Sequence, residues 1–264
     1  MQQSQQLRRQ VGLFGAVMLG LGSILGTGVF VSIGLAAGVA GPDVIRAVMI
    51  GALVAVFNGL SSAQLAANPP VSGGTYEYGY RYLTPRLGVT AGWMCLLAKS
   101  ASAATAALGF AGYLLNAVGV YGNRLALIGI ALTAIAILTA IVATGIRRSN
   151  QTNTLIVSIS IASLIFFVVT GLLRIDAANF TPFFGGEAAS GPTLPALLYA
   201  SALMFVAYTG YGRIATLGEE VTEPRTTSPR AIIATMIVTM TLYLAVAVGG
   251  VGTSGADAMY AATL

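Results

Sequence analysis

The uncharged run from Val11 to Gly41 constrains this chain more than any other feature. A helix needs about 20 apolar residues to cross a bilayer, so the run can span one. Small residues nevertheless crowd its middle: Gly20, Gly22, Ser23, Gly26, Thr27 and Gly28. Each glycine costs about 1 kcal/mol relative to alanine inside a helix, and non-helical backbone at membrane depth is tolerated only where protein or a watery cavity satisfies it. We therefore expect a broken helix that exposes backbone N–H and C=O groups to a solute.

The composition restricts the class of protein. Of the 264 residues, 56% are hydrophobic and 8% are charged, whereas a soluble domain carries about 25% charged residues. The sequence therefore predicts an all-α polytopic membrane protein. The single cysteine, Cys95, excludes an intrachain disulfide, and the absence of histidine excludes histidine acid–base catalysis and histidine metal sites. We expect no enzyme, no cofactor and no metal.

Seven apolar segments are long enough to cross a membrane. They cover residues 11–38, 44–67, 88–117, 124–145, 153–173, 194–217 and 231–252. An amphipathic, tyrosine-rich segment over 71–82 suits the membrane interface. These limits predict five parts: an N-terminus over 1–10, five helices over 11–173, a loop over 174–193, two helices over 194–252 and a truncated tail over 253–264.

The arginines set the expected orientation, because basic residues concentrate in cytoplasmic loops. With the N-terminus inside, nine arginines are cytoplasmic: Arg8, Arg9, Arg81, Arg86, Arg147, Arg148, Arg213, Arg225 and Arg230. Three lie outside: Arg46, Arg124 and Arg174. We therefore expect a multi-pass protein of the plasma or inner membrane with a cytoplasmic N-terminus. The scattered bases indicate topology rather than binding to nucleic acid.

The sixth segment is the counterpart of the first. Its stretch from Phe205 to Gly212 again places glycines and a threonine in mid-span. Gly-interrupted segments at corresponding positions of two halves are the best sequence indication of a transporter site, and segments one and six are five apart. Such breaks offer N–H groups to an anion and carbonyls to an ammonium. An α-amino acid carries both groups. Helix packing through small residues, as at Gly22 and Gly26, remains an alternative.

Several motifs in order resemble the amino acid–polyamine–organocation (APC) family of permeases. They are Gly22–Phe30, Pro70–Tyr76, Tyr208–Tyr211, Ile214–Val221 and Pro224–Ile232. The resemblance covers essentially the whole chain. It implies an inverted five-helix repeat fold with helices 1 and 6 discontinuous, the first repeat complete and the second truncated. It implies secondary transport of an amino acid or related amine by alternating access.

The resemblance also implies the binding residues. The substrate carboxylate would meet backbone amides of Ser23 and of Gly26, Thr27 and Gly28. The amino group would meet carbonyls near Ile24 and on the sixth segment. Those sixth-segment residues are Phe205, Val206, Ala207, Tyr208 and Thr209. The aromatic side chains of Phe205 and Tyr208 would help to cover the substrate.

Three departures from the family pattern concern coupling and length. Gly212 stands where many relatives carry an acidic residue, and Ser160 aligns with a lysine of some proton-coupled relatives. The family core has ten helices and this chain supplies about seven, so we expect a fragment of a longer permease. The coupling ion, proton or sodium, stays open.

Lys99, Glu219 and Glu220 are candidates for coupling or gating. Lys99 is the only lysine and lies inside the third segment. Membrane-embedded charges usually face a cavity or a partner, although a lysine can also snorkel to the interface. The two glutamates, with Glu223, could pair with cytoplasmic arginines as an inner gate, or could be solvated loop charges. Two rival functions remain: a sodium-coupled solute carrier of the same architecture, and a non-transporting membrane scaffold subunit.

Overall fold

The computed structural model describes residues 9–67, 73–120, 122–181 and 194–263. Within these residues, six helical runs are long and apolar enough to cross a membrane. They are Leu13–Ala67, Pro85–Ala117, Arg124–Ala143, Ser149–Leu172, Leu194–Ala215 and Pro224–Ser254. Residues 1–8 of the expected N-terminus over 1–10, the Asn68–Pro70 stretch that follows the second apolar segment, and residues 182–193 of the loop over 174–193 lie outside the described residues. The chain divides into two compact units, residues 1–74 with 154–264 and residues 75–153, which are taken separately.

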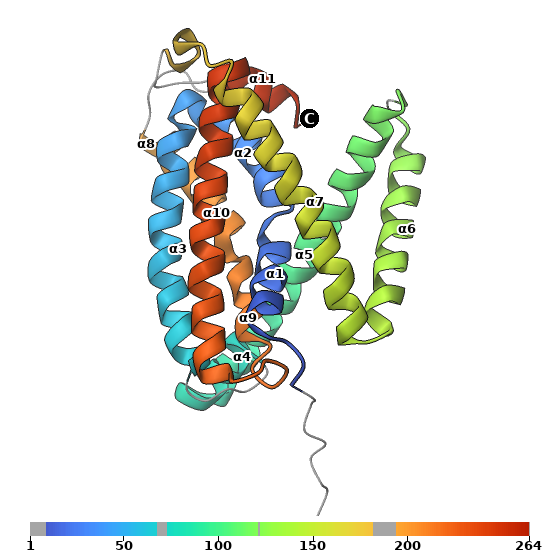
Figure 1. Ribbon diagram of the computed structural model, residues 1–264, viewed down its shortest axis with the longest axis vertical. Helices are drawn as coiled ribbons and strands as arrows, with labels where there is room; N and C mark the ends of the chain where they lie inside the picture. The colour runs from blue at the N-terminus through green and yellow to red at the C-terminus, as the bar shows by residue number, and fades with distance from the viewer. Residues whose placement is uncertain (1–8, 68–72, 121, 182–193, 264) are drawn as a thin grey trace, which may run out of the picture. The chain divides into compact units, whose positions relative to one another are not determined.

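The first run folds back on itself. It contains α1 (Leu13–Ile24), a π-helical turn η1 (Gly28–Ser32), α2 (Ile33–Ala40), a 3₁₀ turn η2 (Gly41–Asp43) and α3 (Val44–Ala67). At about 1.5 Å per residue, the 55 residues of this run would otherwise reach about 80 Å, far beyond a bilayer core of about 30 Å. Gly41 makes the reversal with φ 63°, a value that favours glycine, and α3 then runs back in contact with α2 and α10 (Figure 1).

The rest of the first unit packs around these helices. It contains α8 (Leu194–Tyr208), a 3₁₀ turn η4 (Thr209–Tyr211), α9 (Gly212–Ala215), α10 (Pro224–Ser254), α11 (Ala256–Ala261), the greater part of α7 (Ile146–Leu172) and a 3₁₀ turn η3 (Ala177–Phe180). Helix α3 packs against both α8 and α10, and α1 packs against α10. Glycines make these approaches close: a β-carbon on Gly51 would lie 2.9 Å from the Phe205 nitrogen of α8.

Helix α10 begins earlier than the sequence indicates. The charged stretch before 231 was expected as a loop, but the helix starts at Pro224. Proline suits the first helical position because its missing N–H would have no intrahelical partner there. Glu223 precedes it in the left-handed region, with φ 47°, and its carbonyl accepts from the amides of Thr226 and Thr227, both at 3.0 Å. The loop between α9 and α10 is therefore short.

The second unit is a small helical assembly. It contains α4 (Thr75–Tyr82), α5 (Pro85–Ala117), α6 (Arg124–Ala143) and the first turns of α7. Polar side chains cap two of its helices, since Thr84 accepts from the Leu87 amide at 3.3 Å and Asn123 accepts from the Ala126 amide at 3.0 Å. Between α5 and α6, small side chains form a minor core: Ala107, Ala111 and Ala131.

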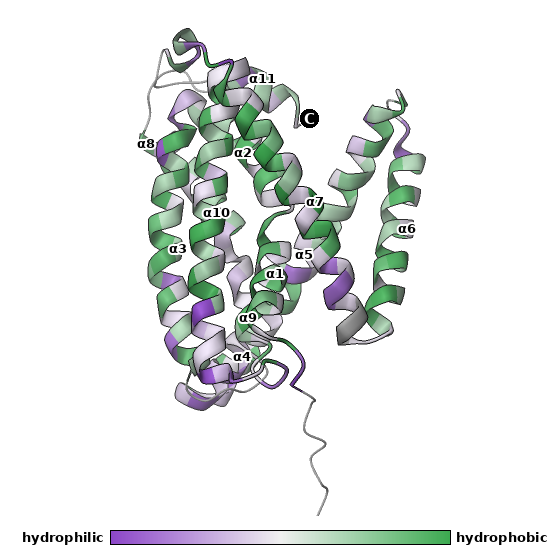
Figure 2. Cartoon of the chain, viewed as in Figure 1, coloured by the Kyte–Doolittle hydropathy of each residue, from purple (hydrophilic) through white to green (hydrophobic). Residues whose placement is uncertain are grey.

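Large apolar side chains stay exposed along the long helices. Leu132 of α6 and Phe166 of α7 are 62% and 71% exposed, and Figure 2 shows hydrophobic colour over most of α3, α6 and α7. Soluble monomers rarely expose continuous apolar surface on this scale, whereas a bilayer covers it. The structure is that of an all-α polytopic membrane protein, as the composition predicts.

Candidate functional site

Helix α1 ends in a tight turn at Leu25. The Leu25 backbone has φ −74° and ψ 71°, and the Gly26 amide donates to the Ile24 carbonyl at 2.8 Å. These values describe an inverse γ-turn, a conformation open to any residue. The described glycines with positive φ do not include Gly20, Gly26 or Gly28. The turn therefore does not depend on a glycine with positive φ.

A tyrosine from α10 binds the end of α1. The Tyr243 hydroxyl donates to the Ile24 carbonyl oxygen at 2.7 Å, and both residues are buried. With the bond from Gly26, the Ile24 oxygen accepts two hydrogen bonds, which uses both of its lone pairs. In this structure the Ile24 carbonyl, expected to receive a substrate amino group, is thus already occupied.

Tyr243 stacks on Tyr208 from α8. The ring centroids lie 4.9 Å apart with an interplanar angle of 33°, within the range in which aromatic pairs attract each other. Tyr208 is 2% exposed and Tyr243 is 0% exposed. The Tyr208 hydroxyl oxygen is buried without a hydrogen-bond partner among the described residues. Leaving such a group unsatisfied costs about 1–3 kcal/mol, so the Tyr208 hydroxyl is a polar group that a ligand could satisfy.

The glycines of the motif differ in what surrounds them. A β-carbon on Gly20 would lie 2.6 Å from Ile214 Cδ1, and one on Gly28 would overlap the Tyr243 hydroxyl. On the other segment, a β-carbon on Gly210 would lie 2.6 Å from the Ser23 carbonyl carbon. A β-carbon on Gly26 would have nothing within 4 Å. Gly20 and Gly28 therefore leave room for side chains of other helices, Gly210 leaves room for the Ser23 backbone, and Gly26 borders open space.

The expected binding residues of the two segments lie in one unit. A β-carbon on Gly28 would be 3.2 Å from the β-carbon of Ala207, so η1 and the end of α8 meet here. Thr27 precedes the π-helical turn η1, and Gly28 is its first residue. The first N–H groups of a helix lack an intrahelical acceptor. The Ser23 hydroxyl donates to the Leu19 carbonyl of its own helix at 3.1 Å.

The remaining α8 candidates are not equivalent. Phe205 is half-buried, whereas the Val206 side chain is 66% exposed. The Val206 carbonyl accepts from the Thr209 hydroxyl at 2.7 Å, so the Thr209 side chain is engaged within its own segment. These positions change from α-helix to 3₁₀ turn at Thr209, which alters the bonding of the last α8 carbonyls.

Lys99 and Ser160 lie outside the contacts described above. Lys99 is on α5 in the second unit, where its side chain is exposed. Ser160 is half-buried on the part of α7 that belongs to the first unit. Their expected roles in coupling stay predictions.

Glu219 and Glu220 lie between α9 and α10, where the N-terminal segment pairs with them. The amides of Gln10 and Val11 donate to the Glu220 carbonyl at 2.9 and 3.1 Å. In return, the Thr222 amide donates to the Val11 carbonyl at 2.9 Å, which gives a parallel bridge between Val11 and Val221. Backbone hydrogen bonds thus join the residues before α1 to the segment between α9 and α10, and a side-chain gate there stays a prediction.

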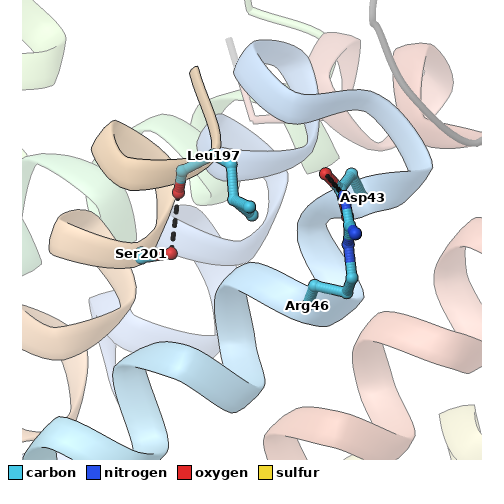
Figure 3. A network of polar contacts seen from close by, with 4 residues as sticks. All are labelled: Asp43, Arg46, Leu197 and Ser201. Carbon is cyan, nitrogen blue, oxygen red and sulfur yellow. Dashed lines mark hydrogen bonds and ion pairs between the residues drawn. The ribbon is translucent and has the colours of Figure 1, made fainter. Parts of the chain in front are cut away.

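An ion pair between an exposed arginine and a buried aspartate stabilises the turn between α2 and α3. The Arg46 guanidinium pairs with both carboxylate oxygens of Asp43, whose side chain is 7% exposed (Figure 3). On α8, the Ser201 hydroxyl donates to the Leu197 carbonyl of its own helix at 2.7 Å (Figure 3). Both interactions are local, so they shape this end of the helices rather than a solute site.

Sequence reasoning missed Tyr243. The available signal was its position in mid-segment, because a buried tyrosine hydroxyl in an apolar helix usually has a hydrogen-bond partner. Thr235 of the same helix was missed for the same reason: its hydroxyl donates across helices to the Val17 carbonyl at 3.4 Å.

Long apolar helices that expose their outer faces define a helical multi-pass membrane protein. The sequence profile of the family described as amino acid permease matches residues 15–260. The chain belongs to this family, which confirms the resemblance found in the motifs.

Curated relatives are transporters by name. An uncharacterized transporter of Mycobacterium tuberculosis is 36% identical over 257 residues, 95% of this chain and 54% of that protein. A branched-chain amino acid permease of Bacillus subtilis is 28% identical over 265 residues, 92% and 54% of the two chains. A methylthioribose transporter of the same species is 29% identical over 260 residues, 92% and 55%. The chain spans about half the length of these relatives.

Proposed function

We propose that this chain holds the substrate site of a secondary transporter for an amino acid or a related amine. The observation that carries the proposal is the meeting of two interrupted segments. Ser23 at the end of α1 contacts Gly210 of η4, and Gly28 of η1 contacts Ala207 of α8. Backbone from both segments therefore comes together beside the buried pair of Tyr208 and Tyr243.

The amides at the start of η1 suit a carboxylate. Of the amides expected to bind it, that of Gly26 donates to Ile24, and Ser23 lies within α1. This leaves Thr27 and Gly28, at the N-terminal end of the helical stretch that continues through α2. Unpaired N–H groups and the positive end of the helix dipole favour an anion there. The open space beside Gly26 leaves room for it.

The α8 side suits the amino group. Its last carbonyls precede a change to 3₁₀ geometry, and such helix ends leave acceptors without intrahelical donors. The Tyr208 hydroxyl adds an acceptor that has no partner among the described residues, and the Phe205 ring is half-buried on the same helix. A zwitterion would thus span from η1 to α8.

Transport by alternating access follows from placing this site between inverted five-helix repeats, with helices 1 and 6 discontinuous. In that arrangement the repeats rock around a site at mid-membrane. The fastening of Val11 to Val221 would let the starts of α1 and α10 move together. The arginine bias supports a cytoplasmic N-terminus in a plasma or inner membrane.

The coupling ion can be proton or sodium, and Lys99 offers a test. In a complete permease that contains this sequence, Lys99→Gln is expected to abolish pH-dependent uptake if a proton is coupled. Uptake that keeps its pH dependence contradicts a role for Lys99, and uptake that follows a sodium gradient instead identifies the sodium-coupled alternative. Proteoliposomes with imposed pH or sodium gradients provide the measurement.

Ligand binding separates the transporter from a scaffold. The purified chain in nanodiscs would be heated with each of the common amino acids, with agmatine and putrescine as amines, and with methylthioribose as a solute lacking both charged groups. A ligand that binds only the native state raises the melting temperature. Stabilisation by an amino acid or amine supports the proposal. Stabilisation by methylthioribose alone, or by no solute, contradicts it, and the second outcome favours the scaffold.

A further inference from the structure

We infer that the Tyr243 hydroxyl is a positioning group: it occupies the Ile24 carbonyl, keeps the helical bond from Gly28 to Ile24 open, and so leaves the Gly28 amide available to a carboxylate. The role of the Gly28 amide in binding a carboxylate rests on the proposed function. The effect of Tyr243 on the bond from Gly28 to Ile24 rests only on the contacts of Tyr243 with these residues.

An uninterrupted helix would join Gly28 to Ile24 by a backbone hydrogen bond. In an α-helix the amide of residue i donates to the carbonyl of residue i−4, so Gly28 would donate to Ile24. In the structure the Ile24 oxygen instead accepts from Tyr243 at 2.7 Å and from Gly26 at 2.8 Å. Two donors use both lone pairs of a carbonyl oxygen, so the site of the helical bond is taken.

The position of the hydroxyl strengthens this inference. A β-carbon on Gly28 would overlap the Tyr243 hydroxyl oxygen and would lie 3.1 Å from the ring carbon that bears it. The hydroxyl therefore lies between the Ile24 carbonyl and the Gly28 backbone, the two partners of the missing bond. Insertion of a side chain into the ladder of helical bonds is a known cause of sharp helix distortion.

The tyrosine is itself held in place. It is 0% exposed, and its ring stacks on Tyr208 with centroids 4.9 Å apart. A fixed ring gives the hydroxyl little freedom to leave. The same contact places Tyr208, whose hydroxyl has no partner in the described part of the chain, next to the group that shapes the break. A ligand that binds the Tyr208 hydroxyl would thus lie close to Tyr243.

Hydrogen exchange tests the structural part without any substrate. Tyr243→Phe keeps the ring and its stacking but removes the hydroxyl. With Ile24 freed, we expect the Thr27 and Gly28 amides to exchange at least tenfold more slowly, because Gly28 can now donate to Ile24. Thr239→Val is the matched control: it removes a hydroxyl that is equally buried on α10 and that bonds only to Thr235 of its own helix. Unchanged or faster exchange in Tyr243→Phe, or equal slowing in the control, overturns the inference.

A double-mutant cycle tests the contact independently. Gly28→Ala brings a methyl group against the hydroxyl and should lower the melting temperature. The same change in the Tyr243→Phe background should lower it less, since the overlapping oxygen is gone. Groups in contact show such non-additivity, whereas distant groups do not. Additive effects overturn the inference.

Binding then tests the link to the carboxylate. If an amino acid stabilises the wild-type chain, Tyr243→Phe should weaken that binding at least tenfold, and Thr239→Val should leave it unchanged. Binding that survives Tyr243→Phe overturns the link to the carboxylate. If no solute binds the wild type, the proposed function fails, while the exchange and cycle results still decide the role of Tyr243.

Discussion

Gly210 and Ser23 meet with no side chain between them. The carbonyl carbon of Ser23 lies within 2.6 Å of where a β-carbon on Gly210 would stand. The end of α1 packs on the turn after α8 through the Ser23 backbone and the Ile24 side chain, whose Cγ1 would lie 2.5 Å from the same β-carbon. Such an approach lets main-chain groups of both segments face one solute, which side chains at this point would prevent.

Gly210→Ala is expected to destabilise the fold. Extra volume in a packed site costs about 1–3 kcal/mol, because here the neighbour is backbone and cannot rotate away. Gly212→Ala, two residues further on, is the control: a β-carbon there meets nothing within 4 Å, and alanine favours helix by about 1 kcal/mol. Thermal unfolding in detergent measures both. A similar response of the two variants contradicts the close approach.

Gly26→Ala should leave the fold intact and weaken the binding of the substrate. A β-carbon on Gly26 meets nothing within 4 Å, so the melting temperature should stay close to that of the wild type. The new methyl group would enter the space proposed for the substrate, and we expect at least a tenfold loss in affinity for the amino acid that binds. Gly129→Ala, on α6 and also facing open space, serves as the control. Unchanged affinity in Gly26→Ala would place the substrate elsewhere.

Tyr208→Phe should act in opposite directions on stability and on binding. Its hydroxyl is buried without a partner in the described structure, so removing it should stabilise the ligand-free chain by about 1 kcal/mol. If the hydroxyl binds the substrate, affinity should fall in the same variant. Melting temperatures with and without ligand give both quantities. A variant that is more stable and binds equally well would show that this hydroxyl does not bind the solute.

Because of Tyr78, the free energy of unfolding is expected to fall in alkali. On α4, burial raises the pKa of Tyr78, and the nearby Tyr82 raises it further. The folded state then holds the proton above the unfolded pKa of about 10. The stabilising contribution is therefore complete below pH 10 and is lost as pH rises towards the folded pKa. Tyr78→Phe should unfold with a weaker pH dependence above pH 10, whereas Tyr80→Phe, whose ring is exposed, should behave as the wild type. Equal slopes in all three proteins contradict this.

The Arg46–Asp43 and Arg81–Glu77 ion pairs should contribute differently to stability. Arg46→Gln leaves the buried Asp43 carboxylate without its guanidinium, and a buried charge without its partner is costly. Arg81→Gln breaks a pair with Glu77 at 3.4 Å that is more exposed on both sides, and such pairs contribute little. We expect a clearly larger fall in melting temperature for Arg46→Gln. A larger effect of Arg81→Gln would reverse this ranking.

The sequence predicts the class well because apolar length is a local property. The segment 44–67 has the same limits as α3, since a polar Asn-Pro-Pro stretch follows it. The start of α10 was missed because Pro224 and its charged neighbours look like a loop, although proline opens helices well. Composition cannot tell these two uses apart.

The details of the site depend on contacts between distant segments. Glycine crowding predicts an unusual stretch, but not whether a glycine serves a turn or a close approach. Here the turn falls at Leu25, and Gly28 and Gly210 serve close approach. The bond from Tyr243 to Ile24 joins residues 219 positions apart. The position of Tyr243 in an apolar segment indicates that its hydroxyl needs a partner, but no local pattern indicates which carbonyl it reaches.

The pairing of Val11 with Val221 has a consequence for biogenesis. Helix α1 is synthesised long before the residues that contact it: Ile214 against Gly20, Thr235 against Val17, Tyr243 against Ile24. At about 5–20 residues per second, these partners follow after roughly ten to forty seconds. During that interval α1 resides in the bilayer with a weak, glycine-rich centre and no neighbour to shape it. Its final form is therefore imposed from the far end of the chain, and a nascent chain stopped before α10 would lack the groups that impose it.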